Sequence, residues 1–213
     1  MYDYVTKNEV DRYRRSCSNY LKKLREILNE DYDITCYFTL IGSGANNLVT
    51  SNGNSYYDLD YNLHILSMPD KYKNNLKQLK DIIRNELNEI VGVGFSDAKD
   101  SRSVLTSILH FKDTPEIEFS FDIAILVQNN NGNWCRLIHN KKFNVGAVSR
   151  SLGIGNEQFT WNEVKNSNKI KQKATVLKQE DLWEEVRDRY LELKNDYLKR
   201  NQEPHRFPRG RGA

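Results

Sequence analysis

Residues Phe38–Leu66 read FTLIGSGANNLVTSNGNSYYDLDYNLHIL, and this stretch decides the fold. A strand predicted over Ile34–Ile41 runs into a Gly-Ser turn, and after a polar loop a second strand carries Asp58 and Asp60. Because side chains alternate between the two faces of a strand, both aspartates project from one face and the apolar residues between them project into a core. Two neighbouring carboxylates repel each other unless a cation lies between them, so the spacing points to a bound cation.

Gly42 and Ser43 stand where the first strand is predicted to turn into a short helix. Backbone N–H groups at such a turn bind phosphate oxygens, and glycine has no Cβ to hold a phosphate away. Asn46, three residues further on, is placed to add a hydrogen bond to a phosphate. Together, the turn and the carboxylates predict a site for a metal-bound nucleotide polyphosphate.

A third carboxylate is expected from Asp122, in the middle of a strand predicted over Ile117–Val127. If that strand lies beside the one with Asp58 and Asp60, three carboxylates meet, which is the ligand set that a pair of Mg²⁺ ions requires. Mn²⁺ would fit the same ligands. Mg²⁺ favours a few carboxylates combined with substrate phosphates. Asp97 and Asp100 are weaker candidates for the third carboxylate.

The ordered set of motifs resembles the DNA polymerase β-like nucleotidyltransferase superfamily. Its signature is an apolar residue followed by Gly-Gly or Gly-Ser, a spacer, two acidic residues that alternate with apolar ones, and a third acidic residue on a later strand. The matching segments are Ile41-Gly42-Ser43, Asp58-Leu59-Asp60-Tyr61 and Phe121-Asp122-Ile123.

The resemblance implies a metal-dependent transferase that moves a nucleoside monophosphate from an NTP such as ATP to an acceptor hydroxyl and releases pyrophosphate by a two-metal mechanism. It implies that Gly42 and Ser43 grip the β- and γ-phosphates. It also implies that Asp58 and Asp60 bind both metals, and that Asp122 binds the catalytic metal and helps to deprotonate the acceptor. The acceptor stays open between RNA, a nucleotide, a protein and a small molecule.

The chain departs from the family pattern in two places. The spacer between Ser43 and Asp58 is longer than usual, and Tyr57 stands where oligoadenylate-synthase-like members commonly have serine. Two alternatives remain beside a compact nucleotidyltransferase. One is another Asp-x-Asp enzyme such as a glycosyltransferase, and the other is a non-catalytic nucleotide- or RNA-binding module of the same fold.

The order of the expected elements indicates an α+β fold, with a mixed sheet packed on one side by helices. We expect a catalytic core over 1–150, a C-terminal helical module over 151–202 and an unstructured tail over 203–213. Outside the segments already described, we expect helices over 7–30, 69–91, 158–172 and 180–200, and strands over 94–98, 103–111 and 134–139.

The charge is distributed unevenly along the chain, although the net charge is only +3. Lys169, Lys171 and Lys173 crowd one segment and are candidates for contacts to a triphosphate or to an RNA acceptor. The 3 cysteines are widely spaced and form neither a zinc pattern nor a disulfide framework. Without an apolar signal core or a spanning segment, the sequence favours the cytoplasm and no membrane partner. It does not indicate the oligomeric state.

Overall fold

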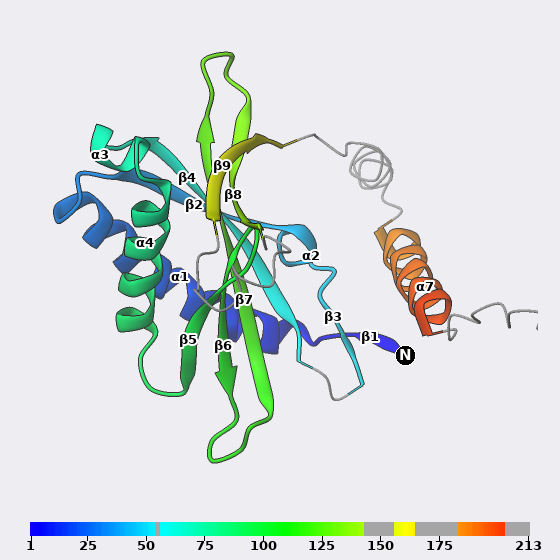
Figure 1. Ribbon diagram of the computed structural model, residues 1–213. Helices are drawn as coiled ribbons and strands as arrows, with labels where there is room; N and C mark the ends of the chain where they lie inside the picture. Colours follow the sequence, from blue (N-terminus) through cyan, green and yellow to red (C-terminus); the bar gives the residue numbers. More distant parts are fainter. Residues whose placement is uncertain (54–55, 143–155, 165–182, 203–213) are drawn as a thin grey trace, which may run out of the picture.

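The computed structural model describes residues 1–53, 56–142, 156–164 and 183–202 (Figure 1). The elements, in chain order, are β1 (Tyr2–Tyr4), α1 (Lys7–Glu30), β2 (Thr35–Ile41), α2 (Gly42–Ala45), β3 (Thr50–Asn52), β4 (Asp58–Ser67), α3 (Asp70–Lys73), α4 (Leu76–Val91), β5 (Phe95–Asp100), β6 (Leu105–His110), β7 (Ile117–Gln128), β8 (Trp134–Lys142), β9 (Asn156–Glu163) and α7 (Trp183–Gln202).

The main sheet, as far as the described residues extend, has seven strands in the order β2-β4-β7-β6-β5, with β8 paired to β7 and β9 paired to β8. Strands β4 and β7 run parallel, whereas the other pairs are antiparallel. The predicted α+β fold with a mixed sheet is therefore confirmed. A second, two-stranded sheet joins β1 to β3.

Helix α1 begins where the sequence predicts it, because the Thr6 side chain accepts a hydrogen bond from the Glu9 N–H at 3.4 Å. Its buried residues recur every three or four positions, so one stripe of the helix faces the sheet. These residues are Val10, Tyr13, Cys17, Leu21, Leu24 and Leu28. They join one core with α4 and with the apolar side chains of β4 and β7. Helices α1 and α4 lie beside each other against the sheet in Figure 1.

Two expected helices differ from the structure. The helix expected over 69–91 is interrupted, because α4 begins anew after Asn75, whose side chain accepts a hydrogen bond from the Gln78 N–H at 3.0 Å. The helix expected over 158–172 is wrong over its first residues, which belong to strand β9. Phe159 and Trp161 alternate along that strand and pair with His139 and Leu137 of β8. The rest of the expected helix lies outside the described residues.

Helix α7 packs against β1 near the chain start (Figure 1). The Asn195 side chain accepts a hydrogen bond from the Tyr2 N–H at 2.8 Å and donates one to the Tyr2 carbonyl at 3.4 Å. The Tyr4 hydroxyl donates to the Arg187 carbonyl at 2.6 Å. This helix matches the one expected over 180–200, although Leu193, which its spacing predicts to be buried, is 52% exposed. The division into a core and a C-terminal module remains a prediction.

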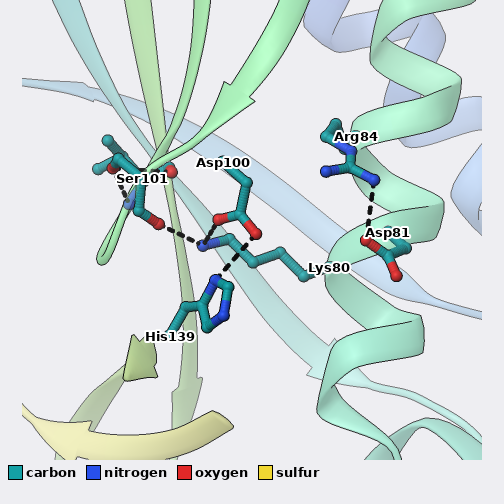
Figure 2. A network of polar contacts seen from close by, with 7 residues as sticks. Lys80, Asp81, Arg84, Asp100, Ser101 and His139 are labelled. Carbon is teal, nitrogen blue, oxygen red and sulfur yellow. Dashed lines mark hydrogen bonds and ion pairs between the residues drawn. The ribbon is translucent and has the colours of Figure 1, made fainter. Parts of the chain in front are cut away.

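A buried ion-pair network anchors β8 and β5 to α4 (Figure 2). The Lys80 ammonium lies 2.5 Å from one oxygen of Asp100, and His139 Nδ1 lies 3.1 Å from the other. Lys80 also donates to the Ser101 carbonyl at 2.9 Å. The Lys80 side chain is only 2% exposed, so its charge depends on these oxygens in place of water. No helix in the described part of the chain is long and apolar enough to cross a membrane.

Replacing Asp100 by alanine is expected to lower the free energy of unfolding by about 3–5 kcal/mol, because it leaves the Lys80 charge buried without its carboxylate. Asp81→Ala is the matched control, since it removes the more exposed Asp81–Arg84 ion pair from the same helix at an expected cost below about 1 kcal/mol. Urea unfolding of the two variants measures both values. Equal losses would contradict an anchoring role for the buried network.

Candidate active site

The aspartates predicted from the motif occupy neighbouring strands. Asp60 of β4 is in direct register with Asp122 of β7, and Asp58 is in register with Ser120. Neighbouring strands lie about 4.8 Å apart, so Asp60 and Asp122 project side by side from the same face of the sheet. This face is opposite the helix-covered core, into which Leu59 and Tyr61 point. The structure thus brings the three predicted carboxylates to one region.

The Gly-Ser turn lies directly against this carboxylate group. Gly42 has φ +64°, in the left-handed region that favours glycine. A Cβ added there would lie 2.9 Å from Asp60 Oδ2, too close for an ordinary contact. The turn and the Asp60 side chain therefore lie so close that any other residue at position 42 would displace the carboxylate.

Side chains on both sides of the turn fix its shape. Asn46, predicted to contact a phosphate, donates from its amide to the Gly42 carbonyl at 2.8 Å. Arg14 of α1 donates to the Gly44 carbonyl and, at 2.8 Å, to Asn47 Oδ1. Asn46 thus has a structural role in the turn, and its contact with phosphate remains a prediction.

The carboxylates perturb each other's ionisation. Burial, followed by the charges of Asp58 and Asp122, raises the pKa of Asp60 to about 6 from its ordinary value of 3.8. Burial also raises the pKa of Asp122, and the nearby Asp58 acts in the same direction. Thr106, which faces Asp122 across the β6–β7 pair, opposes this rise through a side-chain hydrogen bond. Carboxyl groups whose pKa values are raised by burial and by neighbouring carboxylates are typical of functional sites.

Two cations that sequence analysis did not single out act on Asp60. Arg136 of β8 and Lys194 of α7 both lower its pKa through their charges. Lys194 donates to Thr50 Oγ1 at 2.8 Å, and its own pKa is lowered by burial against the opposing effect of Asp58 and Asp60. Both cations come from segments distant in sequence, so no local motif marks them. The only available signal was that β8 follows directly after the strand of Asp122.

Other candidates from the sequence do not belong to this site or lie outside the described residues. Asp100 is engaged in the buried network with Lys80, so it does not replace Asp122. The basic residues at 169, 171 and 173 fall outside the described residues, and their predicted role stays a prediction.

The donor chemistry of the site suits a hard divalent cation. The three aspartates offer only oxygen ligands, which Mg²⁺ and Mn²⁺ prefer. Over the described ranges, no three His, Cys, Asp or Glu side chains are already arranged as ligands of one metal ion. The carboxylates share one face and couple electrostatically without forming a closed cage, so their predicted role as metal ligands remains a prediction.

The pKa of Asp60 predicts how stability depends on pH. Between its ordinary value of 3.8 and the folded value of about 6, the folded protein binds the proton more strongly than the unfolded chain. Asp60 therefore lowers the free energy of unfolding as pH rises through this window. Asp60→Asn removes this penalty and should stabilise the protein at about pH 7.5 by about 1–2 kcal/mol, less than the full shift implies because the carboxyl is partly exposed.

Most of that gain should disappear near about pH 4, where the carboxyl is protonated in the folded protein. Asp97→Asn is the control, since Asp97 is an exposed residue of β5, which β6 separates from the strand of Asp122. Denaturant unfolding at the two pH values measures the difference. A stabilisation that is the same at both pH values, or that Asp97→Asn reproduces, would show that the ionised Asp60 carboxylate does not destabilise the folded protein.

The close approach of Gly42 and Asp60 gives a second test. Gly42→Ala should lower the free energy of unfolding by about 1–2 kcal/mol from its left-handed backbone alone. Gly53→Ala should cost a similar amount, because Gly53 has φ +59° but nothing within 4 Å of an added Cβ. Only Gly42→Ala should also change the rise in melting temperature that Mg²⁺ produces, since its Cβ displaces the Asp60 carboxylate. The same Mg²⁺ response in both variants would argue against contact between the turn and the site.

Comparison with known proteins supports the fold. No family model and no curated protein matches the chain. Among solved structures, the cyclic AMP-GMP synthase DncV of Vibrio cholerae, described as a prokaryotic cGAS homolog, aligns with a TM-score of 0.50 and 10% identity over 65% of this chain and 52% of that chain. Its 3'-deoxy GTP-bound form aligns with the same TM-score and identity over 65% and 51%.

The CD-NTase CdnG of Bradyrhizobium diazoefficiens, solved with GTP, aligns at 17% identity over 76% of this chain and 38% of that chain, with a TM-score of 0.43. This chain spans about half the length of the Vibrio cholerae synthase. At this identity the similarity concerns the fold. The chain shares the α+β fold of this synthase, and its aspartates stand on neighbouring strands as its motifs predict.

Proposed function

We propose that the protein is a divalent-metal-dependent nucleotidyltransferase that transfers a nucleoside monophosphate from an NTP to an acceptor hydroxyl. The observation that carries this proposal is the register pair of Asp60 and Asp122, with the Gly42 turn in contact with Asp60. This arrangement places a phosphate-binding turn beside carboxylates that need a cation. A glycosyltransferase with an Asp-x-Asp motif does not require such a turn, so the geometry favours nucleotidyl transfer.

Asp58, Asp60 and Asp122 would hold the divalent cations. When bound, these ions neutralise the triphosphate and stabilise the charge that develops on the attacking and leaving oxygens. Gly42 keeps the turn close to Asp60, and the turn would hold the β- and γ-phosphates, to which Ser43 offers its backbone N–H and hydroxyl. Lys194 and Arg136 supply positive charge beside the same carboxylates, which favours entry of an anionic substrate.

Asp122 is the group best suited to accept the proton of the acceptor hydroxyl. Burial and Asp58 raise its pKa, which strengthens it as a base, and the hydrogen bond with Thr106 restrains the carboxylate. The acceptor oxygen forms a bond to the α-phosphorus as it loses its proton. The bond from that phosphorus to the β-phosphate oxygen breaks, and pyrophosphate leaves with the electron pair.

The acceptor that this proposal favours is the hydroxyl of a second nucleotide. Support comes from the Vibrio cholerae synthase of the same fold, which has been solved with the linear intermediate 5' pppA(3',5')pG. Because this chain spans about half of that enzyme, the identity of the acceptor is part of the proposal.

Asp122→Asn should lower turnover at least about 100-fold, the scale of a lost general base, in an assay with radiolabelled NTPs and Mg²⁺ or Mn²⁺. The NTP panel is run with nucleotides alone and with total RNA, so that labelled dinucleotides and labelled RNA identify different acceptors. Asp97→Asn, an exposed acidic residue on β5, should keep the activity of the unchanged protein.

Equal turnover by the Asp122→Asn variant and the unchanged protein would exclude Asp122 as base and as metal ligand. If the unchanged protein binds an NTP but forms no product with any nucleotide or RNA, the non-catalytic alternative holds.

A further inference from the structure

The face of the sheet that carries the aspartates continues beyond them with polar side chains. Along β4, Asn62 and His64 follow Asp60 on the same face at intervals of about 7 Å. Arg136 of β8 stands in the row of His64, because Leu126 of β7 is in register with both residues. The Arg136 charge also acts on Asp60, so its side chain extends along the face toward the carboxylates. Asn62, His64 and Arg136 therefore form one polar strip next to the proposed catalytic site.

In the described part of the chain, each residue of the polar strip has one buried polar atom without a hydrogen-bond partner. These atoms are Asn62 Oδ1, His64 Nδ1 and Arg136 Nε. His64 is only 8% exposed, and its other ring nitrogen, Nε2, lies 2.9 Å from Thr39 Oγ1. Proteins seldom leave three such atoms together, because each has lost contact with water without gaining a hydrogen bond. The polar strip thus has unused hydrogen-bonding capacity.

Aromatic rings close the far end of the strip. Tyr37 stacks on His64 with the ring centroids 4.6 Å apart and the planes 8° apart, and Trp134 meets the His64 ring edge-on at 4.4 Å. Burial lowers the pKa of His64, so this ring is neutral at neutral pH. Asn62 and Arg136 stay partly exposed, and they can turn toward a ligand without breaking a hydrogen bond at their buried atoms.

The strip extends in the direction in which a bound NTP would extend. The Gly-Ser turn follows Ile41, which is in register with Asp60. Because β2 and β4 are antiparallel, the turn lies on one side of Asp60 along the strand, and Asn62 and His64 lie on the other. With its terminal phosphates at the turn and its α-phosphate at the carboxylates, a nucleotide directs its sugar and base along about 13 Å of β4 beyond Asp60.

The hydrogen-bonding groups of the strip complement guanine better than the other bases. Arginine pairs with the two adjacent acceptors O6 and N7 of guanine. An asparagine side-chain oxygen accepts from the N1–H and 2-amino groups of the same base. Adenine and cytosine present an amino group, a donor, where guanine has O6, so they oppose a guanidinium. Uracil has a carbonyl at that place but lacks N7.

We propose that Asn62 and Arg136 select guanine as the base of the NTP that this site binds. The Arg136 guanidinium donates to O6 and N7, and the Asn62 side-chain oxygen accepts from N1–H and the 2-amino group. His64 and the rings around it form the end wall beyond the base. This assignment rests on the proposed function, because it requires a nucleotide whose phosphates lie at the carboxylates.

Selection by Asn62 can be tested with the α,β-methylene analogues of GTP and ATP, titrated calorimetrically into the full chain with Mg²⁺. Their α–β bridge resists nucleotidyl transfer, so binding is measured without turnover. The GTP analogue should bind at least about tenfold more tightly, the scale of one bidentate contact to a base. Asn62→Ala should weaken binding of the GTP analogue and leave that of the ATP analogue unchanged. The matched control is Asn19→Ala, an exposed position of α1 on the helix-covered side of the sheet, which should keep the full preference.

The contact of Arg136 is tested with the α,β-methylene analogue of 7-deaza-GTP, which lacks the N7 acceptor. The unchanged protein should bind it severalfold more weakly than the GTP analogue, and Arg136→Met should bind the two analogues equally. Arg136→Met also removes a charge beside Asp60, but this affects both ligands alike, so the ratio of the two affinities reports only the contact to N7.

Three results would overturn the selection of guanine. These are equal affinities of the unchanged protein for the GTP and ATP analogues, an undiminished preference in Asn62→Ala, and an undiminished effect of 7-deaza substitution in Arg136→Met. If product forms from NTPs but the preference is absent, guanine selection fails and the proposed transfer stands. If the preference is present but no product forms with any acceptor, the guanine site stands and the proposed transfer fails.

Discussion

The repulsion between carboxylates on two parallel strands is the constraint on which the rest of the site depends. Parallel pairing of β4 and β7 places Asp60 and Asp122 in register, at a distance where both cannot be charged without cost. The fold partly offsets this cost with positive charge from two remote elements, Arg136 on β8 and Lys194 on α7. Contacts around the site hold these two cations beside the carboxylates.

Several of these contacts lie outside the site, in the elements that carry the two cations. The buried pair of Lys80 and Asp100, with His139, fixes β8 against α4 and β5, and β8 carries Arg136. Helix α7 is held by hydrogen bonds to β1 and by the bond from Lys194 to Thr50 of β3. Each cation that faces Asp60 is therefore positioned by contacts outside the site, so a change far from the aspartates can alter their ionisation.

Sequence reasoning predicted those parts that depend on local pattern. Period-two alternation identified the strands of Asp58, Asp60 and Asp122, and the motif order predicted that these strands are neighbours. Arg136 and Lys194 were missed because nothing near them in the sequence specifies which distant side chain they face. Strand β9 was missed because a lysine-rich segment follows Phe159 and Trp161, and its helical spacing outweighed two alternating aromatic residues. Position 42 was predicted to need glycine, but its contact with Asp60 could only be found in three dimensions.

The parallel pairing of β4 with β7 also has a consequence for how the protein folds. Helices α3 and α4 and strands β5 and β6 all lie between the two paired segments in the chain. Strands β2 and β4 can associate early because only a short connection must close, whereas the β4–β7 ladder requires long-range closure, which slows folding. During synthesis on the ribosome, Asp58 and Asp60 would emerge well before Asp122. The charge repulsion at the centre of the molecule would then arise only when β7 pairs with β4, in the same step that adds the core residues Phe119, Phe121, Ile123 and Ile125.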